Sequence, residues 1–260
     1  MEQLKVEGVD VHVEGRGPTL VMVHGWPDTW RLWDRTVAGL VPGWRCVRFT
    51  LPGFDLAQPP RRMTLQGLLD CYEAVVDAVS PDEPVTLLVH DWGAIFGYEY
   101  AARHPQRVRR IVGVDIGDVT SGDYLRSLSA RAKLMIAGYQ LELALAWKIG
   151  GAAGTRMSRA MARVMRCPTN PASIGWQMNY PYALQWSGGL KGLARFEPRV
   201  PLLYIYGRRK PFQFHSPQWL ERVAALPGGE VAAFETGHWV MTEDPQGFNR
   251  CVRQWLEATG

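Results

Sequence analysis

The chain has 260 residues, 47% of them hydrophobic, which suits one large globular α/β domain with a buried core. Its 29 basic and 25 acidic residues give a net charge of +4, and the basic residues are scattered, which argues against nucleic acid as a partner. The 4 cysteines lie far apart and form no CxxC pair, which argues against a disulfide framework or a metal site.

The sequence contains no segment typical of secretion or of membrane insertion. Residues 1–14 alternate and carry charge, unlike a signal peptide. The most apolar stretch, residues 134–147, is interrupted by Gln140 and Glu142 and is too short to span a bilayer. We therefore expect a cytoplasmic protein with no transmembrane segment. Its oligomeric state stays open, with a homodimer as one alternative.

The first half of the chain alternates predicted strands and helices. Residues 3–14 alternate around a Gly-Val-Asp turn, which predicts a β-hairpin. Residues 64–79 show helical spacing with Thr64 as the N-cap, and another helix is predicted after Asp91, ending near His104. Short apolar runs predict buried strands at 19–23, 44–50, 85–89 and 108–115.

The rhythm changes in the second half. From about 117 to 198 the sequence has only helical stretches, rich in Ala, Leu, Met, Trp and Tyr. Strands resume at 201–206 and 231–234, before a last helix at 245–257. This order predicts an α/β fold with a mostly parallel sheet, helices on both faces and an inserted helical cap. The predicted parts are a first core segment, a cap and a second core segment, at 1–117, 118–199 and 200–260.

The most informative stretch is LLVHDWGA at 87–94, where a strand turns abruptly into a helix with Asp91 at the turn. In α/β hydrolases the nucleophile, usually serine, sits on such a strained turn. A carboxylate needs no base to attack, and here it lies at the positive end of the following helix. The carboxylate can attack an sp³ carbon of a substrate and form an alkyl ester on the enzyme. The sequence therefore predicts Asp91 as a covalent nucleophile and disfavours a serine esterase.

Water must then attack the carbonyl carbon of that ester, which creates an oxyanion that N–H groups have to stabilise. One predicted donor is the backbone N–H of Trp92, directly after the nucleophile. The other is the backbone N–H of Trp26, in the HGWP loop at 24–27 that follows the strand at 19–23.

The predicted base is His238, in a Gly-His-Trp segment between the last strand and the last helix. A base of this kind needs a carboxylate partner to hold its tautomer. The usual place for that acid follows the strand at 201–206, but Lys210 stands there. We therefore assign the acid to Asp115, at the end of the strand before the cap, with Asp118 as the weaker alternative.

Three motifs in this order, HGWP at 24–27, HDWG at 90–93 and GHW at 237–239, resemble the epoxide hydrolase and haloalkane dehalogenase branch of the α/β-hydrolase family. The likeness covers nearly the whole core and is loose in the cap. The aromatic residue after His-Gly resembles epoxide hydrolases, because haloalkane dehalogenases tend to have Asn or Glu there to help hold the halide. Val89 and an acid at Asp115 look more like one group of dehalogenases.

Resemblance to epoxide hydrolases implies two cap tyrosines whose hydroxyls hold the epoxide oxygen, because an alkoxide leaving group needs a proton donor. Tyr139 lies in a segment that resembles the first. The segment Asn-Tyr-Pro-Tyr at 179–182 resembles the second and leaves two alternatives, with Tyr182 favoured for catalysis and Tyr180 as a substrate-binding residue. Cap tyrosines are equally often packing residues.

The sequence thus predicts an epoxide hydrolase-like enzyme that converts a small apolar substrate and water into a vicinal diol, with neither metal nor organic cofactor. One alternative is a haloalkane dehalogenase, which would use the same nucleophile and release halide. An alternative of another class is a non-catalytic small-molecule binder on a hydrolase core, which Lys210 at the usual acid position favours.

Overall fold

The protein is built around a single eight-stranded sheet, which is parallel except for the pairings that β2 makes with β1 and β4. The computed structural model describes residues 1–193 and 196–260. The strand order is β1-β2-β4-β3-β5-β6-β7-β8. The strands are β1 (Glu2–Val6), β2 (Val9–Glu14), β3 (Thr19–Val23), β4 (Arg45–Phe49), β5 (Val85–His90), β6 (Val108–Val114), β7 (Leu202–Gly207) and β8 (Glu230–Phe234).

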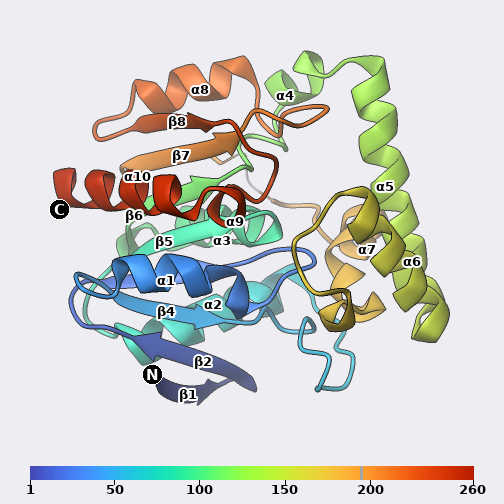
Figure 1. Cartoon of the computed structure of the whole chain (residues 1–260), viewed down its shortest axis with the longest axis horizontal. Coiled ribbons are helices and arrows are strands. Elements are labelled where there is room, and N and C mark those ends of the chain that lie inside the picture. The colour runs from blue at the N-terminus through green and yellow to red at the C-terminus, as the bar shows by residue number, and fades with distance from the viewer. Residues whose placement is uncertain (194–195) are drawn as a thin grey trace.

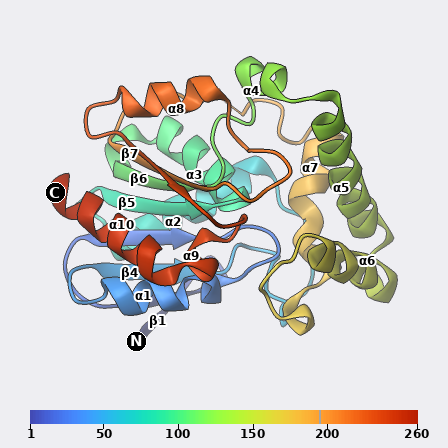
Figure 2. The same ribbon diagram turned by 45° about the horizontal axis from the view of Figure 1, so that its top comes forward.

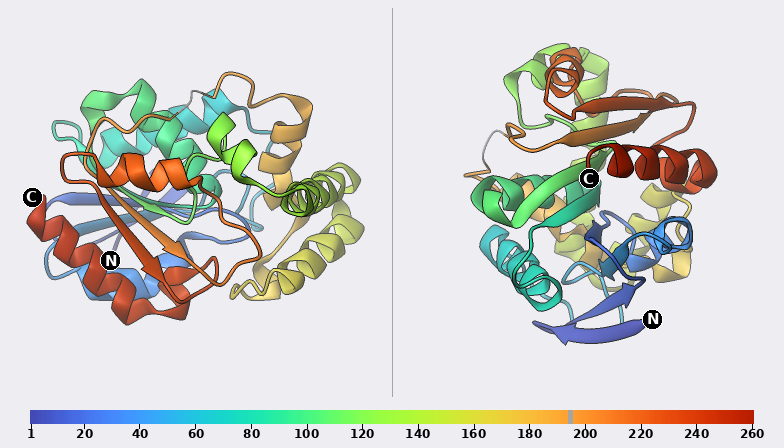
Figure 3. Two further views of the ribbon diagram at one scale, coloured as in Figure 1. Left: turned by 90° about the horizontal axis from the view of Figure 1, so that it is seen from above. Right: turned by 90° about the vertical axis from the view of Figure 1, so that its left-hand side faces the viewer.

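Helices cover both faces of this sheet, and a cluster of buried apolar side chains lies under each set. Helices α2, α3 and α8 pack on one face, and α1, α9 and α10 on the other (Figures 1 and 3). The helices of the core are α1 (Asp34–Leu40), α2 (Leu65–Val79), α3 (Trp92–Arg103), α8 (Pro217–Ala224), α9 (Val240–Glu243) and α10 (Pro245–Ala258). The doubly covered, mostly parallel sheet confirms the predicted fold class.

The chain between β6 and β7 forms a separate group of helices, which we call the helical insertion and define as residues 118–199. Residues 194–195, inside the range predicted for the cap, lie outside the described residues. In Figures 1 and 2, α5, α6 and α7 lie together to one side of the sheet. The helices are α4 (Gly122–Ser127), α5 (Ala130–Ile149), α6 (Gly151–Val164) and α7 (Tyr180–Ser187).

Local chemistry explains why the elements begin where they do. The side chain of Thr64 accepts a hydrogen bond from the backbone N–H of Gly67 and caps α2, as predicted. Ser121, Ser129 and Ser216 cap α4, α5 and α8 in the same way. Among the described residues, no helix combines the length and apolarity needed to cross a membrane.

Candidate active site

Asp91 lies at the sharp turn between β5 and α3. Its φ of 52° falls in the left-handed region, which a residue with a side chain adopts at a cost in strain. Two glycines allow the backbones around it to approach. A Cβ on Gly25 would collide with the Asp91 carboxylate, and a Cβ on Gly93 would collide with the carbonyl oxygen of His24. The sequence thus places a carboxylate at this turn and glycines, which have no side chain, next to it.

The Asp91 carboxylate already accepts hydrogen bonds from the backbone. The N–H of Trp26 donates to Oδ1 at 2.6 Å, and the N–H of Trp92 is close enough to help lower the pKa of the carboxyl group. If Asp91 becomes an ester and water attacks it, the developing negative charge falls on an oxygen that these donors face. The structure therefore brings both predicted oxyanion donors to the predicted nucleophile.

His238 lies between the two carboxylates to which the sequence assigns roles. Its Nε2 is 3.5 Å from Oδ2 of Asp91, and its Nδ1 is 2.5 Å from Oδ2 of Asp115. Asp115 is fully buried directly after β6, where it reaches across to the loop that follows β8. This order of atoms is that of a nucleophile, a base and the acid that orients the base.

The weaker acid candidate, Asp118, is committed elsewhere. Its carboxylate accepts hydrogen bonds from the hydroxyls of Ser121 and Ser216, each at 2.7 Å. It also pairs with Arg222 at 2.9 Å. Asp118 therefore anchors the start of the helical insertion to α8, and Asp115 is the acid that contacts the histidine.

Lys210 pairs with the acid instead of replacing it. Its ammonium group, which is almost fully buried, binds Oδ1 of Asp115. The backbone N–H of Gly207 donates to the same oxygen at 3.1 Å. Both donors hold Oδ1, so Oδ2 is left to face His238. The cation that favoured a non-catalytic interpretation of the sequence thus forms part of the network.

The charges of the site support one another. Burial opposes the charged form of His238, but hydrogen bonds and charges from Asp115 and Asp91 outweigh it and raise the pKa of the imidazole to about 9. Burial also opposes ionisation of Asp91, and contacts with His238 outweigh it and hold the pKa of this carboxyl below its usual value. At neutral pH the Asp91 carboxylate is therefore charged.

Esterification of Asp91 would remove one of the two carboxylates that stabilise the imidazolium. The pKa of His238 must then fall, because only Asp115 still raises it. The imidazole becomes a free base at the moment when water has to be deprotonated. The same pair of carboxylates would therefore serve both halves of a covalent mechanism, if the protein uses one.

Of the three tyrosines predicted in the cap, two line the same cavity as Asp91. Tyr139 and Tyr182 line a cavity of about 510 Å³ together with Asp91 and Trp92. The ring of Tyr182 is 5.2 Å from that of Trp92 and 6.1 Å from that of Tyr139. Burial raises the pKa of the Tyr139 and Tyr182 hydroxyls well above the usual value for tyrosine, so both stay protonated at neutral pH.

Tyr180 lies outside this cavity. Its ring packs edge-on against Phe54 at 5.5 Å, and its hydroxyl is buried without a hydrogen-bond partner among the described residues. The structure therefore does not bring Tyr180 to the other predicted site residues, and its surroundings are those of a packing residue.

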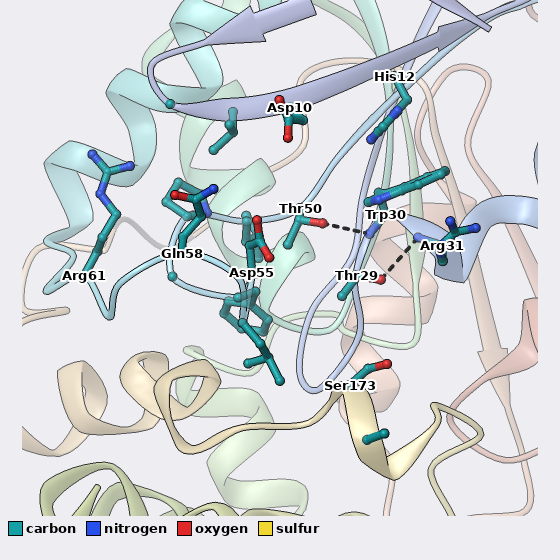
Figure 4. A pocket seen from close by; sticks show the side chains of 18 residues that line it. Asp10, His12, Thr29, Trp30, Arg31, Thr50, Asp55, Gln58, Arg61 and Ser173 are labelled. Atoms are coloured by element: carbon teal, nitrogen blue, oxygen red, sulfur yellow. Dashed lines mark hydrogen bonds between the residues drawn. The ribbon is translucent and has the colours of Figure 1, made fainter. Parts of the chain in front are cut away.

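A second cavity, of about 350 Å³, lies apart from the first. Figure 4 shows Asp10 of β2 near Asp55, which belongs to the segment between β4 and α2, and His12 beside Trp30. Ser173 of the helical insertion lies on the opposite side of this cavity. Its lining is distinct from that of the Asp91 cavity, and it plays no part in the arrangement described above.

Two residues near Asp91, Asn179 and His90, make contacts to which the sequence assigns no role. The indole N–H of Trp26 donates to Oδ1 of Asn179 at 2.7 Å, which ties the oxyanion loop to the helical insertion. The ring of His90 lies 4.4 Å from that of His238, and burial lowers the pKa of His90 to about 3, so it stays neutral. Both contacts depend on tertiary structure, with partners distant in the sequence.

Replacing Lys210 tests its position in the network. In Lys210→Met, the charge of Asp115 is no longer shared with a cation and acts more fully on His238, so the imidazole holds its proton to higher pH. We expect the rising limb of the kcat–pH profile to move to higher pH. At neutral pH, kcat falls roughly tenfold for each unit of that movement.

The matched control is Lys210→Arg, which keeps the charge and should keep the profile. The other charged or titratable groups facing His238 are Asp91, His90 and Asp28, and all are unchanged in both variants. A loss of thermal stability in Lys210→Met without movement of the profile would assign Lys210 a purely structural role.

Comparison with known proteins places this geometry in a family. The sequence model of the alpha/beta hydrolase fold matches residues 18–245. A "Cis-3-alkyl-4-alkyloxetan-2-one decarboxylase" from Xanthomonas campestris is 34% identical over 93% of this chain and 89% of that protein. A "Probable oxidoreductase EphD" from Mycobacterium tuberculosis is 39% identical over 36% of this chain, and the match spans only 17% of that longer protein.

Solved structures with the same fold include both enzyme groups that the motifs resemble. A putative epoxide hydrolase from Pseudomonas aeruginosa has a TM-score of 0.75 and 19% identity, over 99% of this chain and 96% of that one. A putative ancestral haloalkane dehalogenase has a TM-score of 0.70 and 18% identity, over 100% of this chain and 99% of that one. These likenesses and the family match agree with the motifs, and the chain belongs to the α/β-hydrolase fold family.

Proposed function

We propose that the protein is an epoxide hydrolase that works through a covalent ester on Asp91. The observation that carries the proposal is the continuous line of contacts from the Trp26 N–H through Asp91 and His238 to Asp115. A carboxylate at this strand-to-helix turn suits attack on an sp³ carbon, whereas a serine hydroxyl there would suit attack on an acyl carbon. The cavity above it contains two protonated tyrosine hydroxyls, which suit an oxygen leaving group.

In the first step, an oxygen of Asp91 attacks one epoxide carbon and the carbon–oxygen bond breaks. The epoxide oxygen, which stays on the neighbouring carbon, takes a proton from Tyr139 or Tyr182 as the bond breaks. The tyrosine then recovers a proton from solvent. In the second step, His238 takes a proton from water, and the hydroxide attacks the ester carbonyl carbon. The tetrahedral intermediate, held by the N–H groups of Trp26 and Trp92, breaks its bond to the alkyl oxygen, which takes the proton from His238 and leaves as the diol. The Asp91 carboxyl group then loses its proton to solvent. The net reaction adds one water to one epoxide.

A halide would find fewer donors in this site. The Trp26 indole N–H is already bonded to Asn179, so that side chain does not face the nucleophile as a halide ligand. The Trp92 indole remains, close enough to the Tyr182 hydroxyl to interact with it. This arrangement favours oxygen as the leaving atom.

A second candidate substrate is a strained four-membered lactone. The relative from Xanthomonas campestris, which matches nearly the whole chain, carries a name that specifies an oxetan-2-one. The carbon next to the ring oxygen of such a lactone is also open to attack by Asp91. Its leaving group is a carboxylate, which needs no proton donor, so lactone opening would depend little on the tyrosines. That carboxylate would then leave as carbon dioxide while the electron pair of the broken carbon–carbon bond forms an alkene and expels Asp91 as the free carboxylate.

One turnover in heavy-oxygen water tests the proposed mechanism. With more enzyme than styrene oxide, the first diol should contain ordinary oxygen taken from Asp91, and the heavy label should appear in the protein. A diol labelled directly from solvent would contradict the proposal. Parallel incubations with a dialkyl β-lactone and a bromoalkane distinguish the candidates, through release of carbon dioxide or of bromide.

The tyrosines separate the candidates further. We expect the double variant Tyr139→Phe/Tyr182→Phe to lose about 10²–10⁴-fold in kcat with epoxides, the usual contribution of a positioned proton donor. Lactone opening should change much less. Tyr180→Phe is the matched control, because its hydroxyl lies outside the cavity and has no partner among the described residues. An equal loss in the double variant and in Tyr180→Phe would reject a proton-donor role.

A further inference from the structure

The exposed apolar side chains of the protein are concentrated in the helical insertion. Apart from Met1 and Leu56, every large hydrophobic side chain that is exposed in the described part of the chain belongs to it. Monomeric proteins rarely expose a contiguous apolar surface of this kind unless it meets a partner or a membrane. These side chains are Leu125, Leu134, Met135, Leu141, Leu145, Ile149, Val164 and Trp186.

On α5, four of the five exposed apolar residues form one continuous stripe. Leu134, Leu141 and Leu145, which are 75%, 47% and 50% exposed, follow helical spacing along one face, and Ile149 continues it at 51%. Gly138 fills the remaining position and has open space where its Cβ would lie. The opposite face, which includes Leu143, is buried against the rest of the insertion. Helix α5 lies at the outer edge of the molecule in Figures 1 and 3.

Basic residues surround this stripe. Arg131, Lys133 and Lys148 on α5, with Arg156 and Arg163 on α6, are all exposed. No ion pair to an acidic side chain is found for these five within residues 1–193 and 196–260. The two helices together contain one acidic residue, Glu142, which is half-buried. Leucine flanked by arginine and lysine is typical of helices that rest on a membrane surface.

We propose that α5 and α6 dock the protein on an anionic lipid surface. The charge decides between a lipid surface and a second copy of the chain, because two copies paired through this face would bring their basic residues together. Anionic headgroups complement those residues, and the leucine stripe would enter the boundary between headgroups and acyl chains. We define the stripe as Leu134, Leu141, Leu145 and Ile149.

The entrance of the Asp91 cavity adjoins this surface. Leu125, Lys133 and Trp186 line the cavity and are also exposed, so they mark its rim. Lys133 is next in sequence to Leu134, the first residue of the stripe. An apolar substrate dissolved in lipid would therefore reach the cavity without crossing water. This consequence rests on the proposed function, whereas docking itself does not.

Vesicle co-sedimentation of the full chain without substrate tests the proposal. We expect binding to vesicles of phosphatidylcholine mixed with phosphatidylglycerol, much weaker binding to pure phosphatidylcholine, and release by salt. Leu141→Ser and Leu145→Ser should each weaken binding by at least about tenfold, because each removes a leucine from the lipid boundary. Lys148→Gln should weaken it by about fivefold. Leu56→Ser is the matched control for an exposed leucine outside the insertion.

Equal binding to neutral and anionic vesicles would overturn the proposal, as would binding that the stripe variants leave unchanged. A wild-type dimer in light scattering that becomes a monomer in Leu141→Ser would assign the stripe to a second copy instead. Hydrolysis of water-soluble epoxides should be the same in wild type and in these variants. Loss of vesicle binding and loss of chemistry are therefore measured separately.

Discussion

Asp91→Asn is expected to lower kcat by about four orders of magnitude or more, with whichever substrate the wild type turns over. The amide nitrogen that replaces one oxygen is not nucleophilic, and the remaining oxygen is neutral, so no ester forms. Losses of this size are typical when a covalent nucleophile is removed from an enzyme that retains its other groups. Steady-state turnover of styrene oxide, measured against the wild type, checks the prediction.

The substitution is suitable because it preserves shape. The Asn side chain can still accept the hydrogen bond that the Trp26 N–H donates to Oδ1, so the loop should keep its position. Circular dichroism and the midpoint of thermal unfolding serve as controls for folding. If the variant keeps more than about a hundredth of wild-type turnover while remaining unable to form an ester, water attacks the substrate directly and covalent catalysis is rejected.

The core could be predicted from the sequence because its signals are local. The buried run of β5, Asp91 and Gly93 lie within nine consecutive residues, 85–93, and together they specify the sharp strand-to-helix turn. The same holds for Thr64, whose capping hydrogen bond reaches only as far as Gly67. Strand limits differ from the predictions by a residue or so, as at β7, where pairing with β8 extends the strand through Gly207.

The parts that the sequence left open depend on contacts between distant segments. Lys210 occupies the place of the expected acid, and only the folded chain brings it against Asp115. The choice between Tyr180 and Tyr182 was open for a similar reason. The two lie only two residues apart, within the first turn of α7. The packing of Phe54 on Tyr180 decides which one faces the cavity.

His238→Gln is expected to separate the two halves of the reaction. Attack by Asp91 does not need a base, so the ester should still form, although loss of the imidazolium removes a charge that holds the pKa of Asp91 down. Hydrolysis of the ester needs the base, and it should slow by about 10²–10⁴-fold. The alkylated enzyme should therefore accumulate. Intact-protein mass spectrometry after mixing with styrene oxide would detect one added substrate mass, and peptide mapping would locate it on Asp91.

The outcome distinguishes base catalysis from a role in binding. A burst of one substrate per enzyme followed by slow turnover places His238 in the second half only, because a residue needed for binding would suppress the burst as well. Asp115→Asn provides the comparison. It keeps the imidazole but weakens its hold on a proton and on the correct tautomer, so the ester should accumulate to a smaller extent. If His238→Gln forms no ester with any epoxide, β-lactone or bromoalkane while Asp91 stays ionised, the histidine acts before the ester, and a two-step mechanism in this site is wrong.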